Sequence, residues 1–172
     1  MSIQEFYEFQ TGAITRKVSN ARVFLLSARS WGIIQQNMFL TFSSGAAVVL
    51  QEMGKAYGQD LAKEAKRWSR HPSEALRALQ SLAGVSGWGT VTLRGDPIYE
   101  SGLTISVDGC VFCSELPPTK TADGVCYFLR GVLRGLTDGL YGGSHEVKET
   151  TCAVRGEDKC TFRVTRAGPP PP

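Results

Sequence analysis

The chain has 172 residues, a net charge of +3 and an apolar fraction of 42%. This length predicts one domain, which buries about 70% of the surface that the unfolded chain exposes. The small net charge without a basic run argues against nucleic-acid binding, and no apolar run approaches the roughly 20 residues of a membrane span. Glu5, Glu8, Arg16 and Lys17 give the first twenty residues a pattern unlike that of a signal peptide. We therefore expect a cytoplasmic protein.

The first part of the chain is predicted to contain a leader, a short strand and a helix. Residues 1–20 form a weakly patterned leader, and residues 22–26 (RVFLL) predict a strand that is buried on at least one face. Ser27 is suited to cap a helix whose apolar residues recur at spacings of three and four. Those apolar residues are Trp31, Ile34, Met38 and Phe42.

A second helix is predicted at residues 45–68, and small residues make much of it thin. Gly54, Ala56 and Gly58 lie close together within it. Each glycine in a helix costs about 1 kcal/mol relative to alanine, so this pattern indicates that another element lies close to the backbone. Three explanations are open: packing against another helix, the wall of a ligand channel, and a dimer seam.

The rest of the pattern predicts an α+β fold. A helix at residues 73–82 is followed by strands at 90–94 and 103–107, a helix at 123–141 and a hairpin centred on Gly156. Two hairpins that share an antiparallel sheet, with a helix between them in the chain and helices packed on one side, give this class. We assign residues 21–166 to a single domain and residues 167–172 to a flexible proline-rich tail.

Three of the five cysteines converge on the predicted hairpin and the helix before it. Cys152 and Cys160 lie four residues on either side of Gly156, which places them opposite each other with Cβ atoms about 4.5–5.5 Å apart. Cys126 lies near a helix start, where a thiolate is stabilised. These sulfurs predict a zinc corner that lacks one ligand; the alternatives are free buried thiols and a Cys152–Cys160 disulfide.

The sequence carries no enzyme signature that we recognise: P-loop, GxSxG, HExxH and dinucleotide fingerprints are missing. His145 could act as a base with Cys152 or Glu146, but its GGSHE context predicts a loop histidine. We therefore lean toward a non-catalytic protein.

Three blocks of sequence resemble the 4-vinyl-reductase-like domain, a ligand-binding module related to TRAPP-type tethering subunits and haem-NO-binding sensors. The blocks are RVFLL with LQEMGKAYG, then DGVCYFLRGVLRG, then ETTCAVRGEDKCTFRV. Together they extend over nearly the whole of residues 21–166. The last block is the most specific, because two cysteines and a glycine turn must fall in register.

The resemblance implies a zinc site, since phenol-sensing bacterial activators with this domain hold zinc through cysteines at this spacing and a carboxylate. The implied thiolates are Cys126, Cys152 and Cys160. For the fourth ligand we rank Cys113 first, Glu115 second and Cys110 third. A straight strand would direct only one of Cys110 and Cys113 to the cluster, whereas a turn at CVFC would offer both. Four protein ligands would make the zinc structural.

Two functions follow as hypotheses from the resemblance. The first is a module that binds an apolar small molecule or acyl ligand in a pocket. We expect that pocket to be lined by Trp31, Phe39, Met53, Tyr57 and Trp88. The second is an interaction scaffold like a TRAPP-type subunit, with a protein partner and a homodimer formed through residues 27–68. An accessory role in tetrapyrrole vinyl reduction ranks third.

Overall fold

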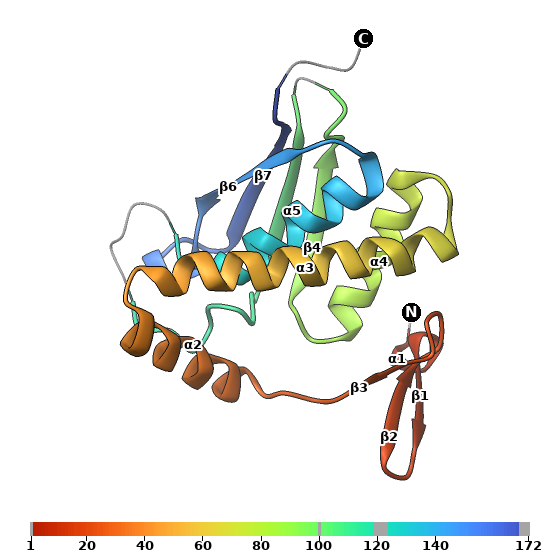
Figure 1. Cartoon of the computed structure of the whole chain (residues 1–172), viewed down its shortest axis with the longest axis horizontal. Helices are drawn as coiled ribbons and strands as arrows, with labels where there is room; N and C mark the ends of the chain where they lie inside the picture. The colour runs from red at the N-terminus through yellow and green to blue at the C-terminus, as the bar shows by residue number, and fades with distance from the viewer. Residues whose placement is uncertain (1, 100, 119–123, 169–172) are drawn as a thin grey trace.

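The computed structural model describes residues 2–99, 101–118 and 124–168, with a main sheet covered by helices and a smaller N-terminal sheet (Figure 1). In chain order the elements are α1 (Ile3–Phe6), β1 (Tyr7–Gln10), β2 (Ala13–Arg16), β3 (Ala21–Val23), α2 (Ala28–Phe42), α3 (Gly45–Trp68), α4 (Pro72–Val85), β4 (Thr90–Gly95), β5 (Leu103–Asp108), α5 (Tyr127–Tyr141), β6 (His145–Thr151), η1 (Ala153–Arg155) and β7 (Cys160–Arg166). Most of the predicted tail lies outside the described residues. No helix of the described part is both long enough and apolar enough to cross a membrane.

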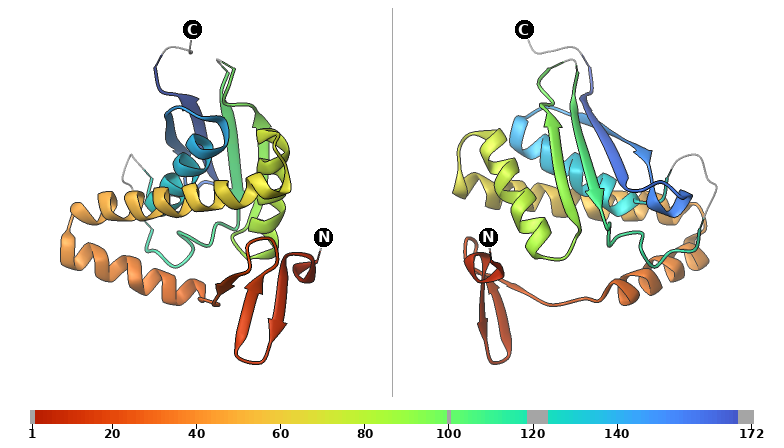
Figure 2. Two further views of the ribbon diagram at one scale, coloured as in Figure 1. Left: turned by 45° about the vertical axis from the view of Figure 1, so that its right-hand side comes forward. Right: turned by 180° about the vertical axis from the view of Figure 1, so that it is seen from behind.

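The main sheet has the strand order β4-β5-β7-β6 and is antiparallel throughout. Its two hairpins meet at the β5–β7 pair, where Ile105 lies opposite Phe162. Alternate residues of β5, β6 and β7 are buried, on the face that α4 and α5 cover, and α3 packs over α5 (Figures 1 and 2). The predicted α+β fold, with helices on one side of a sheet built from two hairpins, is confirmed.

Helices α3 and α5 pack so closely that only glycine fits between their backbones. A Cβ atom at Gly54 or Gly58 of α3 would collide with a backbone carbonyl oxygen of α5. In the same way, a Cβ atom at Gly131 or Gly135 of α5 would collide with a carbonyl oxygen of α3. Of the three explanations for the small residues of α3, packing against another helix therefore accounts for Gly54 and Gly58.

The first twenty residues, expected to be a weakly patterned leader, contain a helical turn and two strands. Strands β1, β2 and β3 form their own antiparallel sheet, which projects to one side of the main sheet (Figure 1). Arg16 of β2 forms a buried ion pair with Glu64 of α3, and the ring of Phe6 packs edge-on against Trp68. These contacts fix the small sheet to α3.

The segment between the two sheets corrects one prediction. The strand expected at residues 22–26 ends at Val23, and the expected burial is wrong for the next residues, because Phe24 and Leu25 are 80% and 78% exposed. No described element packs over them. Ser27 then caps α2 as predicted, since its Oγ accepts the N–H of Ser30 at 3.1 Å.

The close contact of α3 with α5 generates a stability prediction. We expect Gly135→Ala to lower the free energy of unfolding by about 3 kcal/mol, because the new methyl group has to push two helix backbones apart. Gly84→Ala in α4 is the matched control: its Cβ meets only one carbonyl oxygen, at 4.0 Å. Alanine there should be neutral or stabilising by up to about 1 kcal/mol. Urea denaturation measures both, and equal effects would contradict the prediction.

Candidate functional site

All five cysteines converge at one end of the main sheet, and all are buried as free thiols. Their sulfur atoms lie close together: Cys113 Sγ and Cys126 Sγ are 3.4 Å and 3.7 Å from Cys160 Sγ. Cys152 Sγ is 4.0 Å from Cys160 Sγ, and Cys110 Sγ is 3.9 Å from Cys126 Sγ. Cys160 is thus the centre of the cluster.

Each sulfur reaches the cluster from a different local structure. Cys126 is the N-cap of α5, a position that the sequence suggested for Asp123 or Gly124. Cys152 follows the last residue of β6 and Cys160 is the first residue of β7, so the hairpin brings them together as its spacing predicts. Because the N-terminal turn of a helix stabilises negative charge, Cys126 lies where a thiolate is favoured.

Cys110 and Cys113 both join the cluster because strand β5 ends before them. The strand stops at Asp108, and Gly109 follows with φ +63°. The chain then turns, with the N–H of Cys113 donating to the carbonyl oxygen of Cys110 at 3.4 Å. The straight-strand geometry, which would admit only one of the two sulfurs, does not apply here.

Glu149 is the ligand candidate that sequence reasoning missed. It lies on β6 in alternation with the buried His145 and Val147, and its side chain points inward. Its Oε2 accepts the N–H of Cys126 at 3.1 Å, while its Oε1 is buried without a hydrogen-bond partner in the described part of the chain. Gly124 leaves room for this carboxyl group, since a Cβ there would collide with it.

Burial raises the pKa of Glu149 to about 8. The sulfurs differ among themselves: hydrogen bonds from Cys110, Cys113 and Cys126 hold the pKa of Cys160 below its usual range. The hydrogen bond with Cys110 is the main cause that raises the pKa of Cys126. A buried carboxyl group and a cluster of thiols that share protons in this way are the donor set of a metal site.

The ligand atoms form two sets of four, and the two sets overlap. Cys126, Glu149, Cys152 and Cys160 form one set; Cys110, Cys113, Cys126 and Cys160 form the other. Within each set all ligand atoms lie within 4.8 Å of one another. Zinc with Zn–S bonds of about 2.3 Å in a tetrahedron requires S···S separations of about 3.8 Å, which the sulfur distances match.

The structure places the remaining ligand candidate elsewhere. Glu115 is exposed and belongs to neither set of ligand atoms. Its side chain lies beside Gly32 of α2, whose missing Cβ makes room for it. Glu115 lies in the turn beyond the two cysteines, on the side that faces α2 rather than the sulfur cluster.

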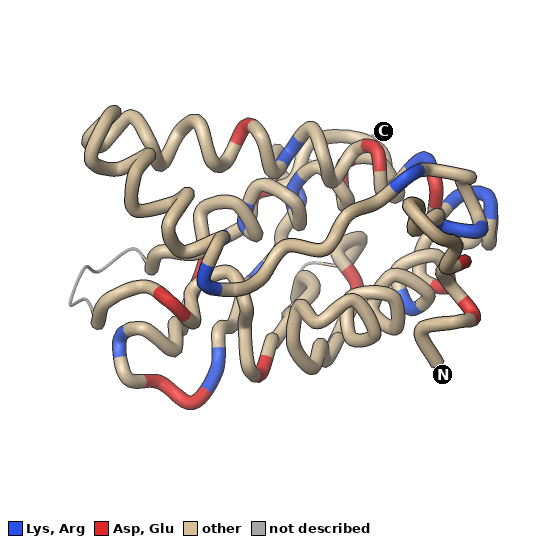
Figure 3. The backbone as a smooth tube through the Cα atoms, turned by 90° about the horizontal axis from the view of Figure 1, so that it is seen from below, with Lys and Arg blue, Asp and Glu red and all other residues tan. Residues whose placement is uncertain are grey.

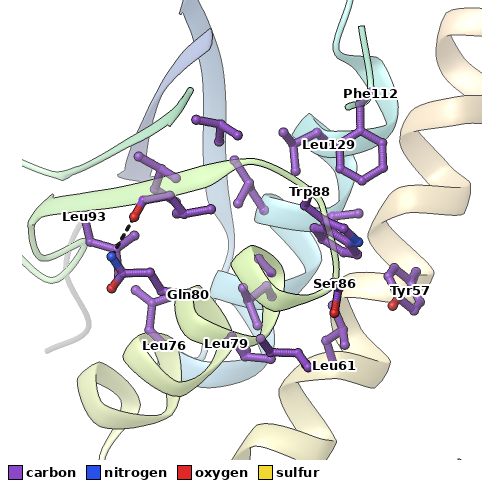
Figure 4. A pocket seen from close by; sticks show the side chains of 18 of the residues that line it. Tyr57, Leu61, Leu76, Leu79, Gln80, Ser86, Trp88, Leu93, Phe112 and Leu129 are labelled. Carbon is purple, nitrogen blue, oxygen red and sulfur yellow. Dashed lines mark hydrogen bonds between the residues drawn. The ribbon is translucent and has the colours of Figure 1, made fainter. Parts of the chain in front are cut away.

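A second feature is an apolar cavity of about 80 Å³ between α3, α4, α5 and strands β4 and β5 (Figure 4). Leucines of α4 and α5 and the aliphatic side chains of β4 and β5 form most of its wall. A few polar groups lie at its edge: Gln80 donates to the carbonyl oxygen of Val91 at 2.7 Å, and Ser86 Oγ pairs with Tyr7 Oη at 2.8 Å.

Two of the five residues expected to line a pocket lie at this cavity, namely Tyr57 and Trp88. The structure does not bring the other three there. Trp31 packs edge-on against Phe112 and Phe128, Phe39 packs against Tyr127, and Met53 is 49% exposed on α3. The cavity lies deeper than expected, between α5 and the sheet, because α3 contacts α5 directly through glycine.

The prediction of a loop position for His145 is wrong. This residue begins β6 and is buried, and its Nδ1 lies 3.0 Å from Oδ1 of Asp138 at the end of α5. It therefore pairs with neither Cys152 nor Glu146. The pair fastens α5 to the strand that follows it.

Comparison with known proteins places this architecture. The family model of the 4-vinyl-reductase-like domain matches residues 103–166, the segment that contains all five cysteines and Glu149. Residues 103–166 are 4-vinyl-reductase-like. The resemblance stated from the sequence is confirmed, and the segment supplies β5, α5, β6 and β7. An uncharacterized protein of Methanocaldococcus jannaschii, MJ0745, is 32% identical over 62 residues, which are 36% of this chain and 33% of that protein.

Solved structures share the fold around this segment. The phenol-responsive sensory domain of the transcription activator PoxR, with phenol, has a TM-score of 0.76 at 19% identity, over 94% of this chain and 85% of that one. A vinyl-4-reductase family protein from M. jannaschii reaches 0.58 at 17% identity, over 88% and 87%. A trafficking protein particle complex subunit 3 from Naegleria fowleri, covalently bound to palmitic acid, reaches 0.58 at 19%, over 80% and 90%.

Proposed function

We propose that this protein is a non-catalytic regulatory module that binds a small aromatic molecule in the apolar cavity and is stabilised by a structural zinc ion. The observation that carries the proposal is the cavity itself, an apolar space inside the main core with a few polar groups at its edge. The likeness in fold to a sensory domain solved with phenol supports the choice of ligand class.

The size and lining of the cavity limit the ligand. An apolar cavity of about 150 Å³ in another protein accommodates benzene, so a cavity of about 80 Å³ accepts one ring only with small shifts of its wall. Leucine side chains offer dispersion contacts to such a ring. Gln80, Ser86 and Tyr7 offer hydrogen-bonding groups to a single hydroxyl. A monocyclic phenol fits these requirements.

The zinc ion of this proposal is held by Cys126, Glu149, Cys152 and Cys160. Support comes from the buried, half-satisfied carboxyl group of Glu149 and from the agreement of this set with the three thiolates and a carboxylate that the family resemblance implies. With four protein ligands the ion has a structural role. It fixes the first turn of α5, the helix whose Leu129, Val132, Leu133 and Leu136 line the cavity.

A homodimer formed through helices α2 and α3 is the second part of the proposal. Residues 30–51 contain no charged side chain, and Figure 3 shows the helical hairpin of α2 and α3 largely without charge. Large apolar side chains are exposed along this region and the segment before it. They are Phe24, Leu25, Leu26, Ile33, Ile34, Leu40, Phe42, Val48, Val49 and Met53. An exposed apolar patch of this kind is typical of an interface, and a second copy presents the same patch.

An interaction scaffold is the alternative function, and the same patch favours it. The likeness in fold to a trafficking complex subunit supports a partner protein on this face. A dimer with an occupied cavity and a scaffold are compatible. They differ in whether ligand in the cavity changes the behaviour of the protein.

Binding of phenol is tested with a variant that fills the cavity. Ala83→Leu on α4 adds bulk at the cavity wall and should weaken phenol binding by more than about tenfold in isothermal titration calorimetry. Ala78→Leu, on the same helix but outside the cavity lining, should bind like the wild type. Absence of phenol binding to the wild type, or equal loss in both variants, would count against the cavity as the site.

Removal of the carboxylate tests the zinc ligands. Glu149→Gln should weaken zinc binding by at least about tenfold in competition with a chromophoric chelator, because the amide is a poor zinc ligand. Glu146→Gln, an exposed position on the same strand, is the control and should match the wild type. If both variants bind zinc as tightly as the wild type, Glu149 is not a ligand.

The dimer is tested by light scattering coupled to size-exclusion chromatography at micromolar concentration. Leu40 is 82% exposed on α2, and Leu40→Glu should raise the dimer dissociation constant by at least about tenfold because it places a charge in the seam. Ile98→Glu changes an exposed apolar residue between β4 and β5 and should leave the dimer intact. A monomeric wild type would refute the homodimer.

A further inference from the structure

We propose that the sulfur cluster binds a second divalent metal ion of the zinc class through Cys110 and Cys113, with Cys126 and Cys160 as thiolate bridges between the two ions. This inference rests on the zinc site proposed above and extends it. Each ion then has four protein ligands: one has four sulfurs, and the other has three sulfurs and the carboxylate of Glu149.

The first observation is that Cys110 and Cys113 are placed as ligands although the first ion does not need them. Their exposed fractions are 3% and 1%, and both sulfurs lie within 4.8 Å of those of Cys126 and Cys160. They stand in a Cys-x-x-Cys turn closed by the N–H of Cys113 and the carbonyl oxygen of Cys110. That spacing is common at zinc sites, where a tight turn presents two sulfurs to one ion.

The second observation is the set of distances around the shared edge. Cys126 Sγ and Cys160 Sγ are 3.7 Å apart, and this pair belongs to both sets of ligands. Cys110 lies 3.9 Å from Cys126, and Cys113 lies 3.4 Å from Cys160. A tetrahedral ion with Zn–S bonds of about 2.3 Å needs edges of about 3.8 Å. Two tetrahedra that share the Cys126–Cys160 edge therefore account for all five sulfurs.

Charge balance favours two ions over one ion that exchanges between the two sets. Three thiolates, a carboxylate and one divalent ion carry a formal charge of about −2. When a second ion binds, it adds two positive charges while Cys110 and Cys113 each lose a proton to solvent, so the formal charge stays the same. A single ion would instead leave two donors of one set buried without metal.

Backbone groups around the bridging sulfurs support the remaining negative charge. Cys126 is the N-cap of α5, a helix of 15 residues, whose first turn presents N–H groups and a positive dipole end. The N–H of Ala153 points at Cys160 Sγ at 3.5 Å. Both bridges thus have a backbone donor or a helix end beside them.

The test is the metal content of the full chain, reduced and reconstituted with zinc without oxygen, by native mass spectrometry. We expect two ions in the wild type and in the control Ser114→Ala, and one ion in the double variant Cys110→Ser/Cys113→Ser. We also expect one ion in Glu149→Gln/Cys152→Ser, because its four-cysteine set is intact. Circular dichroism checks that each variant is folded.

The outcomes separate this inference from the zinc site on which it rests. One ion in the wild type that persists in Cys110→Ser/Cys113→Ser overturns the second ion and leaves the first. One ion that is lost in that variant but retained in Glu149→Gln/Cys152→Ser overturns both, because the ion then uses the four cysteines. A wild type without metal also overturns both.

A measurement on the wild type alone keeps the inference testable if a variant fails to fold. Cobalt(II) replaces zinc, and thiolate bridges couple the unpaired electrons of two neighbouring cobalt ions. The electron paramagnetic resonance signal should therefore rise with the first equivalent of cobalt and fall with the second. A signal that doubles with the second equivalent would show two uncoupled ions and exclude the bridges.

Discussion

The convergence of sulfur atoms at the start of α5 is the constraint on which the rest of the structure depends. Three separate parts of the chain meet there: the turn after β5, the N-cap of α5, and the open end of the β6–β7 hairpin. The hydrogen bond from the N–H of Cys126 to Glu149 holds the helix start against the strand even without a metal ion. A common centre of this kind sets where α5 begins and at what height it crosses the sheet.

Helix α5 carries that constraint to the other features of the molecule. Its inward residues form one wall of the cavity, and its glycines admit the backbone of α3 on the opposite side. The pair of Asp138 with His145 fixes its far end. Because both ends of α5 are anchored and its middle is in backbone contact with α3, the helix has little freedom to move. Changes in the cavity are therefore taken up more readily by α4, which lies at its open side.

The sequence specified the hairpins and the three central thiols because strand alternation and a glycine turn depend only on local spacing. Glu149 was not recognised, because an acidic residue on a strand gives no sign of whether its register faces the core. Cys110 and Cys113 depended on where β5 ends, which Gly109 decides after a residue that continues the alternation. The N-terminal strands are four residues long or shorter and are fixed by Arg16 and Glu64, which lie 48 positions apart. Such a long-range contact leaves no local pattern.

Helix α3 joins the two parts of the proposed function. Tyr57 and Leu61 on its C-terminal half line the cavity, and Val48, Val49 and Met53 on its N-terminal half belong to the exposed apolar patch. Gly54 and Gly58 lie between and within these groups, where the helix rests on the backbone of α5. A contact between two backbones cannot be adjusted by rotating side chains, so a shift of α3 at the cavity moves the patch as a rigid extension of the same helix. The glycines that cost the isolated helix stability thus give it a fixed bearing surface, along which the state of the cavity and the geometry of the interface are coupled.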